Sequence, residues 1–246
     1  MKIMIINPDY GMTREEMDLR CHILSEYVGS DTELYMECLT ETKVYVDSAF
    51  DVVMAGPEIV KRAMKAEEDG FDAVVLYCFS DPALDACREA LSIPVVGGGQ
   101  ASCLTSMMVG RQSGILITDK RRMSEKMAFR YQTGLMPENI KAIESVDLCD
   151  IDVWKEREKT VDALIDASQK LMQKEEVQVI ILGCLSFLGL AKPLTKVLQI
   201  PVIDSAIAAV SMAESLVRQK LFTSKIAYAT PPAGKRSWQE GSITIG

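Results

Sequence analysis

Two short apolar runs, each ending in a cysteine, constrain this chain most. The first extends from Ala73 to Cys78 and the second from Val179 to Cys184. A proline opens a further apolar run 16 or 17 residues after each cysteine, at Pro94 and Pro201. Short, continuous apolar runs are typical of strands buried inside a parallel sheet. The repeated arrangement therefore predicts two similar halves, each with one cysteine at the end of a buried strand.

Apolar runs and amphipathic segments alternate along the chain, as in α/β proteins with parallel sheets. The pattern predicts strands over 2–7, 33–39, 71–78, 94–96, 114–118, 140–146, 177–184, 201–203 and 224–229. It predicts helices over 13–28, 57–69, 81–91, 99–110, 120–132, 153–174 and 204–220. We therefore expect an α/β fold of two pseudo-symmetric domains, each a parallel sheet flanked by helices, with the active site between them.

The restart of the pattern near residue 110 sets the expected domain limits. We expect a first domain over 1–105 and a second over 106–220. The C-terminal segment 221–246 is a candidate to return to the first domain, although residues 231–246 show too little periodicity to predict an element.

Composition and charge exclude several classes of protein. The chain has 246 residues, 48% of them apolar, which is enough for a sizeable core. Its net charge of -8 argues against nucleic acid as a partner, because phosphate binding depends on clustered Lys and Arg. No apolar run approaches the ~20 residues that span a bilayer, and the first residues lack the features of a signal peptide. We expect a cytoplasmic protein that binds a small-molecule substrate, with no nucleic acid and no membrane as partner.

The cysteine and histidine counts restrict the chemistry. Seven cysteines, an odd number without a secretion signal, indicate reduced thiols. The chain has no Cys-x-x-Cys pair and His22 is its single histidine, so we expect no metal site built from Cys and His. A single histidine also makes a Ser-His-Asp or Cys-His arrangement a poor candidate.

The ends of the buried strands carry the candidate site, because parallel α/β sheets bind ligands at the carboxyl ends of their strands. Cys78 and Cys184 end matching strands. Backbone N–H groups that follow each cysteine favour a thiolate and can also stabilise an oxyanion. The candidate substrate-binding residues are those that follow the cysteines and two polar residues that are expected to end strands in equivalent places: Phe79, Ser80, Leu185, Ser186, Asn7 and Thr118.

Two thiols in matched positions suit a two-base reaction. One cysteine, as the thiolate, removes a proton from carbon, and the other returns a proton to the opposite face. The carbon must lie next to a carbonyl group, so that the carbanion is stabilised as an enolate. A free cysteine is more often a small buried hydrophobe, but the matched context of Cys78 and Cys184 favours the catalytic interpretation. The cysteines without such symmetry are predicted to be structural: Cys21, Cys38, Cys87, Cys103 and Cys149.

Three other features have ordinary structural interpretations. The three glycines 97–99 lack the spacing of a dinucleotide or phosphate loop and predict a tight strand-to-helix turn. Asp81 is predicted to cap the helix that follows it. The charged residues 155–159 are predicted to form a solvated helix face.

Several of these segments together resemble one family. They are Ile6-Asn7-Pro8, the stretch Cys-Phe-Ser-Asp-Pro-Ala-Leu-Asp over 78–85, Pro94 to Gly97, Ile181 to Cys184, and Ile200 to Asp204. The chain resembles the aspartate/glutamate/hydantoin racemase superfamily, and the hydantoin (allantoin) racemase branch in particular. The likeness spans about residues 2–220.

The resemblance implies a pseudo-symmetric two-domain α/β isomerase that uses no cofactor or metal. It implies that Cys78 and Cys184 are the two bases, with Asn7, Ser80 and Thr118 near the ligand. The implied substrate is a 5-substituted hydantoin or a related ureide such as allantoin, and the implied assembly is a homo-oligomer.

Alternatives remain open at this point. Related branches racemise aspartate or glutamate or isomerise maleate, and two-domain α/β pairs also serve as non-catalytic binding proteins. The chain departs from the family pattern at Gln100, where an acidic residue is expected, at Leu185-Ser186-Phe187 after the second cysteine, and at Asp9-Tyr10-Gly11 after Asn7-Pro8. These departures bear on substrate identity more than on reaction type.

Overall fold

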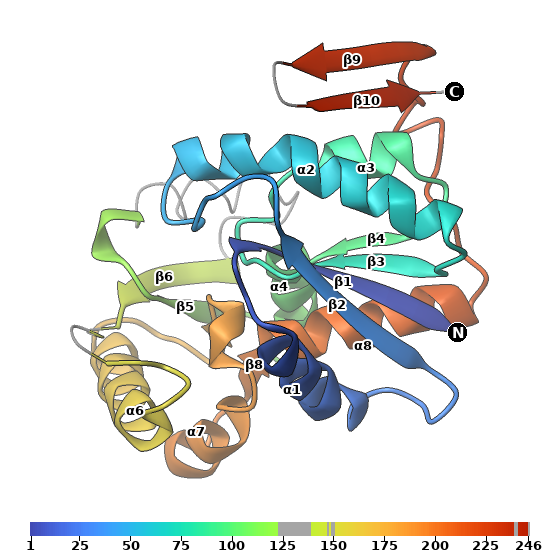
Figure 1. Cartoon of the computed structure of the whole chain (residues 1–246). Coiled ribbons are helices and arrows are strands. Elements are labelled where there is room, and N and C mark those ends of the chain that lie inside the picture. Colours follow the sequence, from blue (N-terminus) through green and yellow to red (C-terminus); the bar gives the residue numbers. More distant parts are fainter. Residues whose placement is uncertain (123–138, 147, 149–150, 239–240, 246) are drawn as a thin grey trace. The chain divides into compact units, whose positions relative to one another are not determined.

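The computed structural model describes residues 1–122, 139–146, 148, 151–238 and 241–245 (Figure 1). The chain divides into two compact units. Unit 1 consists of Met1–Tyr77, Asp81–Gly97 and Val210–Gly246, and unit 2 of Cys78–Ser80 and Gly98–Ala209. The short segment that begins with Cys78 is therefore grouped with the unit that also carries Cys184.

Unit 1 is built on a four-stranded parallel sheet of order β2-β1-β3-β4. Its helices α2 and α3 cover one face of this sheet, and α1 lies on the other face (Figure 1). The strands are β1 (Lys2–Tyr10), β2 (Glu33–Leu39), β3 (Ala73–Leu76) and β4 (Val95–Gly97), and the helices are α1 (Arg14–Ser25), α2 (Ala49–Glu68) and α3 (Leu84–Ala90).

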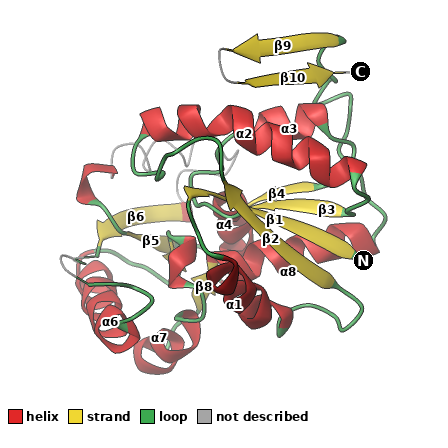
Figure 2. Ribbon diagram, viewed as in Figure 1, coloured by secondary structure: helices red, strands yellow, loops and turns green. Residues whose placement is uncertain are grey.

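Unit 2 repeats the same architecture. Its parallel sheet has the order β6-β5-β7-β8, which matches the strand order of unit 1. The strands are β5 (Ser113–Ile117), β6 (Ile140–Ser145), β7 (Val179–Leu182) and β8 (Val202–Asp204). The helices are α4 (Gly98–Val109), α6 (Arg157–Lys174) and α7 (Ala191–Leu198), with short 3-10 turns η1 (Lys120–Arg122) and η3 (Leu185–Phe187). The predicted α/β fold, with two parallel sheets flanked by helices, is confirmed (Figure 2).

Successive side chains along the strands of unit 2 point to opposite faces of the sheet, so the core of this unit lies on both faces. Ile180 and Leu182 point to the face covered by α6 and α7, where they join Leu116 in one apolar cluster. The opposite face of β5 meets α4, since the hydroxyl of Ser113 donates to Ser106 over 3.0 Å. A shift of register by one residue would exchange the two faces and would remove the contact of Ser113 with Ser106.

The chain after Val210 packs with unit 1. Helix α8 (Ser205–Arg218) ends there, and Arg218 forms ion pairs with Asp31 and Glu214. The ammonium group of Lys225 donates to the carbonyls of Arg88, Glu89 and Leu91 at the end of α3. A cation at this place satisfies carbonyl groups that a helix leaves without partners.

Three predicted helix starts were wrong. Helix α6 begins at Arg157, four residues after the predicted start at residue 153. Helix α2 begins eight residues before Pro57, and the hydroxyl of Ser48 accepts the N–H of Asp51 as its cap, so Pro57 lies inside the helix. Helix α3 begins at Leu84, not at residue 81, and no side chain caps it.

The predicted strand ends also need correction. Strand β1 continues through Asn7-Pro8 to Tyr10, so the Asn-Pro pair does not stop it. Residues 225–228 form a turn where a strand was predicted, and the C-terminal residues form an antiparallel hairpin of β9 (Gly234–Trp238) and β10 (Gly241–Ile245) that the sequence did not predict. Of the helix predicted over 120–132, only 120–122 lie within the described residues.

The described residues contain no helix with the length and apolar character needed to cross a bilayer.

A buried carboxylate, Glu58 of α2, holds the loop after β2 in place. It accepts N–H bonds from Thr40 at 2.8 Å, from Thr42 at 2.6 Å and from Glu41, and it pairs with Arg62 at 2.9 Å. Burial alone would raise the pKa of Glu58, but these N–H donors and the guanidinium of Arg62 hold its pKa below the usual range.

We predict that Glu58→Gln lowers the free energy of unfolding at pH 7 by about 1.5–3 kcal/mol, because charged hydrogen bonds to buried groups are lost. Because the folded-state pKa of Glu58 is depressed, its contribution is present above the usual carboxyl pKa and disappears as the pH falls through the folded-state value. Urea unfolding of both proteins as a function of pH measures this difference. Glu68→Gln, at an exposed position of the same helix, is the control. An equal effect of the two substitutions would contradict the prediction.

Candidate active site

The strand registers place Cys78 and Cys184 in equivalent positions. In unit 1 Leu76 of β3 pairs with Ile6 of β1, and in unit 2 Leu182 of β7 pairs with Leu116 of β5. Each cysteine lies two residues beyond the last residue of its strand. The equivalence predicted from the sequence is therefore confirmed by the backbone pairing.

The predicted equivalence of Asn7 and Thr118 was wrong by one residue. Asn7 directly follows Ile6, and the residue that directly follows Leu116 is Ile117, so Thr118 corresponds to Pro8. The environments differ accordingly: Asn7 is 2% exposed and its amide donates to the sulfur of Met12, whereas Thr118 is exposed. The continuation of β1 beyond Asn7 removed the strand end on which the alignment depended. A role for either residue in substrate binding stays a prediction.

The residues after the two cysteines show the same alternation of exposure. Cys78 and Cys184 are half-buried, and so are the serines two positions later, Ser80 and Ser186. The residues between them, Phe79 and Leu185, are each 3% exposed. Each of these two segments is thus a Cys-x-Ser triplet whose middle side chain is apolar and buried. The sequence displays this triplet twice, but its meaning depends on the burial of its middle residue.

Cys78 and Leu185, the residue after Cys184, both lie close to Gly98, the first residue of α4. A Cβ atom at Gly98 would lie 2.9 Å from the side chain of Leu185 and 3.3 Å from the carbonyl oxygen of Cys78. Only glycine allows such a close approach of backbone. The structure therefore brings the backbone of Cys78 and the residue after Cys184 to the same point in unit 2. The tight strand-to-helix turn predicted at the glycines 97–99 is confirmed, since β4 ends at Gly97 and α4 begins at Gly98.

The other cysteines provide a contrast. Cys38, Cys87 and Cys103 are buried in the core, as predicted. Burial raises the pKa of Cys87 to about 12. Burial, together with the charge of Asp18, raises the pKa of the half-buried Cys21 to about 11. Neither of these two thiols forms an appreciable amount of thiolate near neutral pH. Cys149 lies outside the described residues.

Asp81 was predicted to cap α3, and this prediction was wrong. Its backbone is left-handed, with φ of 48°, and its carboxyl group lies against the end of β4. A Cβ atom at Gly97 would lie 2.4 Å from the Cγ of Asp81. Aspartate tolerates the left-handed region better than most residues. The local conformation thus directs the carboxyl group toward Gly97.

Asp204 carries a second carboxyl group at a strand end, and its contacts were not predicted from the sequence. Asp204 ends β8 and accepts N–H bonds from Gly189 at 2.7 Å, Ala206 at 3.0 Å and Ile207 at 3.3 Å. Burial raises the pKa of Asp204 to about 6, against the lowering effect of these bonds and of Arg157. The available signal was an aspartate at the junction of a buried strand and a helix, a position that suits a helix cap.

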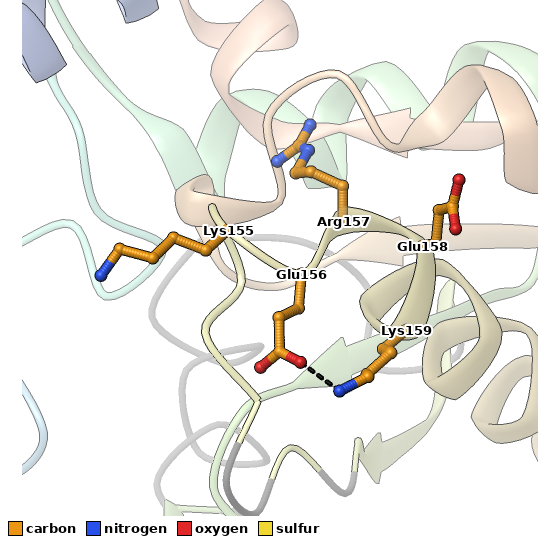
Figure 3. A pocket seen from close by; sticks show the side chains of 5 residues that line it. All are labelled: Lys155, Glu156, Arg157, Glu158 and Lys159. Carbon is orange, nitrogen blue, oxygen red and sulfur yellow. Dashed lines mark hydrogen bonds and ion pairs between the residues drawn. The ribbon is translucent and has the colours of Figure 1, made fainter.

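The charged residues 155–159 line a hollow at the start of α6 (Figure 3). Lys155 and Lys159 are largely exposed, and Lys159 pairs with Glu156. The predicted solvated helix face is confirmed for Glu158 and Lys159, whereas Lys155 and Glu156 precede the helix, which begins at Arg157. Arg157 differs, since it points away from this pair and its guanidinium donates to the carbonyl of Leu188.

No group of three or more His, Cys, Asp or Glu side chains is placed to hold a metal ion within the described ranges.

Comparison with known proteins identifies the family. The model of the Asp/Glu/hydantoin racemase family matches residues 3–213. The chain belongs to this family. A hydantoin racemase from Pseudomonas sp. (strain NS671) is 29% identical over 230 residues, which cover 92% of this chain and 90% of that protein.

Two solved structures share the fold over nearly the full length. The allantoin racemase from Klebsiella pneumoniae has a TM-score of 0.87 and 27% identity, covering 97% of this chain and 96% of the other. The allantoin racemase from Pseudomonas fluorescens has a TM-score of 0.87 and 25% identity, covering 97% and 100%. Family and relatives together make this protein a racemase, which is an isomerase.

We predict that Gly98→Ala destabilises the protein by about 1–3 kcal/mol, because the added methyl group overpacks the contact with Leu185 and Cys78. The cost should be smaller in a Leu185→Ala background, since one of the two obstacles is then removed. Chemical denaturation of the four proteins of this cycle measures the coupling. Gly56→Ala is the control, because its Cβ would meet only an ordinary contact at 3.8 Å. Additive effects of Gly98→Ala and Leu185→Ala would show that the two residues do not interact.

Proposed function

We propose that this protein is a cofactor-independent racemase in which Cys78 and Cys184 act as two bases at a carbon next to a carbonyl group. The observation that carries the proposal is the equivalence of the two cysteines in register, exposure and following sequence. A racemase that works in both directions needs one proton-transfer group on each face of a planar intermediate. Two thiols in repeated positions meet this requirement.

The proposed reaction begins with proton abstraction by one thiolate. The electron pair of the C–H bond moves into the neighbouring carbonyl group, which gives an enolate with negative charge on oxygen. The other cysteine, as the thiol, then donates its proton to the opposite face of the carbon. The first cysteine now carries the proton and the second is the thiolate, so the enzyme is set for the reverse direction.

The enolate oxygen requires hydrogen-bond donors. We assign this role to the N–H groups and hydroxyls after the cysteines, at Ser80 and Ser186, with Phe79 and Leu185 as the apolar anchors that fix the two segments. Asn7 and Thr118 complete the proposed substrate-binding set. Because Asn7 and Thr118 are not equivalent, they would make different contacts with the substrate.

We propose a 5-substituted hydantoin or a related ureide such as allantoin as the substrate. The support is the likeness to hydantoin and allantoin racemases over almost the whole chain. Both compounds place a C–H group next to a carbonyl of a ring, as the mechanism requires. Leu185-Ser186-Phe187 directly follow Cys184, and Gln100 lies in α4. We propose that these departures from the family pattern adapt the pocket to the side chain of a particular substrate.

We further propose that the protein acts as a cytoplasmic homo-oligomer on a small molecule, with neither nucleic acid nor membrane as a partner. The family relationship supports the assembly, and the net charge of -8 disfavours nucleic acid.

A substrate panel in deuterated water tests the reaction class and the substrate together. One enantiomer of each 5-substituted hydantoin, of allantoin, of aspartate and of glutamate is incubated with the protein, and maleate is tested for isomerisation. We expect loss of optical activity with uptake of one deuterium at the reacting carbon for a hydantoin or allantoin. Activity on the amino acids or on maleate alone would favour those branches. No exchange with any compound would refute the racemase and favour a binding protein.

Single substitutions distinguish the roles of the two cysteines. We predict that Cys78→Ser and Cys184→Ser each reduce racemisation by about 10²–10⁴-fold, the usual contribution of a general acid or base. Each variant should still exchange deuterium into one enantiomer only, with retention of configuration, and the two variants should prefer opposite enantiomers. Cys21→Ser is the control with a half-buried thiol on α1. Full racemisation by either variant would eliminate that cysteine as a base.

A further inference from the structure

One peptide group in the loop after Cys184 is held at both ends by charged side chains. The carbonyl of Leu188 accepts a hydrogen bond from the guanidinium of Arg157, and the N–H of Gly189 donates to Asp204 at 2.7 Å. These two atoms belong to the same peptide unit. A cation from the first turn of α6 and a carboxyl group from the end of β8 therefore hold the Leu188–Gly189 peptide from two sides.

The loop has little freedom elsewhere. The carbonyl of Cys184 accepts the N–H of Phe187 at 3.1 Å, and the side chains of Phe187 and Leu188 are fully buried. On the other side of Cys184, the hydroxyl of Ser205 donates to the carbonyl of Leu182. Adjacent residues, Asp204 and Ser205, thus fix the chain both before and after the cysteine.

This arrangement depends on the backbone conformation of Gly189. Its φ of +82° is strained for any residue with a Cβ atom, and a Cβ there would lie 3.2 Å from the guanidinium of Arg157. The left-handed conformation orients the peptide so that its carbonyl and N–H reach Arg157 and Asp204.

Unit 1 contains a related device built from a different residue. Gly97 pairs with Leu76 as Asp204 pairs with Leu182, so Gly97 and Asp204 are equivalent. The carboxyl group of Asp81, three residues after Cys78, lies against Gly97. Each half therefore has a carboxyl group at the end of its fourth strand, associated with the loop after its cysteine, although the aspartate comes from a different element in each case.

We propose that Asp204 and Arg157 are positioning residues that fix the direction of the Cys184 thiol by clamping the Leu188–Gly189 peptide. Neither residue acts on the substrate. The role in racemisation rests on the proposed function of Cys184, whereas the clamp itself can be tested without a substrate. Displacement of a reacting group by about 1 Å costs on the order of 10²-fold in rate, so a device that fixes the loop has a direct effect on proton transfer.

The test compares Asp204→Asn and Arg157→Gln with Glu158→Gln as the matched control. Asn keeps only one acceptor oxygen, so it cannot serve both Gly189 and the N–H groups of α8. Gln at position 157 removes the cation from the Leu188 carbonyl. Glu158 is exposed and lies next to Arg157 in the first turn of α6. Arg157→Lys tests rescue, because it restores a charged donor.

The substrate-free readout is the alkylation rate of Cys184 by iodoacetamide, measured by peptide mass spectrometry in a Cys78→Ser background. The reactivity of a thiol depends on its surroundings, and a released loop no longer holds the Cys184 thiol in the surroundings that the clamped loop gives it. We expect alkylation at Cys184 to slow by about five-fold or more in Asp204→Asn and in Arg157→Gln, with partial recovery in Arg157→Lys. Cys21 in the same molecules provides an internal reference whose rate should not change.

The second readout is racemisation by the same variants with Cys78 intact. We expect kcat to fall by about ten-fold or more while KM changes by less than about three-fold, because the thiol is displaced and the rest of the pocket is retained. A purely structural role would lower the stability to urea without this separation of kcat from KM. If Asp204→Asn does not fold, Arg157→Gln decides, since Arg157 is half-buried whereas Asp204 is buried.

The outcomes separate the clamp from the proposed function. Slower alkylation without racemase activity in the wild type would support the clamp and refute the racemase. Variants that fold and keep both the alkylation rate of Cys184 and kcat within two-fold of the wild type would overturn the clamp and leave the racemase intact.

Discussion

The rest of the structure depends on the pairing of a fully buried strand, β3 or β7, with the first strand of its sheet. All four residues of each buried strand are shielded from solvent on both faces. Such a strand can present functional groups only beyond its end, because every side chain within it is part of the core. The parallel register fixes where that end lies relative to the neighbouring strands. As a result, two cysteines 106 residues apart in sequence come to occupy equivalent positions.

Much of this arrangement could be predicted from the sequence. The apolar runs before Cys78 and Cys184 are long enough and uniform enough to indicate buried strands, and their repetition indicated the duplication. The glycines at 97–99 indicated the turn into α4. These predictions succeeded because they depend on local composition and on spacing along the chain, which a single sequence displays directly.

Features set by long-range register were not accessible in the same way. Asn7 and Thr118 looked like equivalent strand ends, but β1 passes through Asn7, and the pairing of Leu116 moves the counterpart to Ile117. The sequence suggested that Asp81 caps a helix, but its left-handed φ directs its carboxyl group toward Gly97. The contribution of Asp204 depends on a loop 15 residues earlier in the chain, and nothing in the local sequence reveals that contact.

The central claim is that both Cys78 and Cys184 face the substrate. The most direct measurement is alkylation of the wild-type protein by iodoacetamide with and without a saturating hydantoin or allantoin, followed by peptide mass spectrometry. The account predicts that both cysteines react near neutral pH, that the ligand protects both to a similar extent, and that Cys21 is unaffected. Protection of only one of the two cysteines, or of neither, would contradict it.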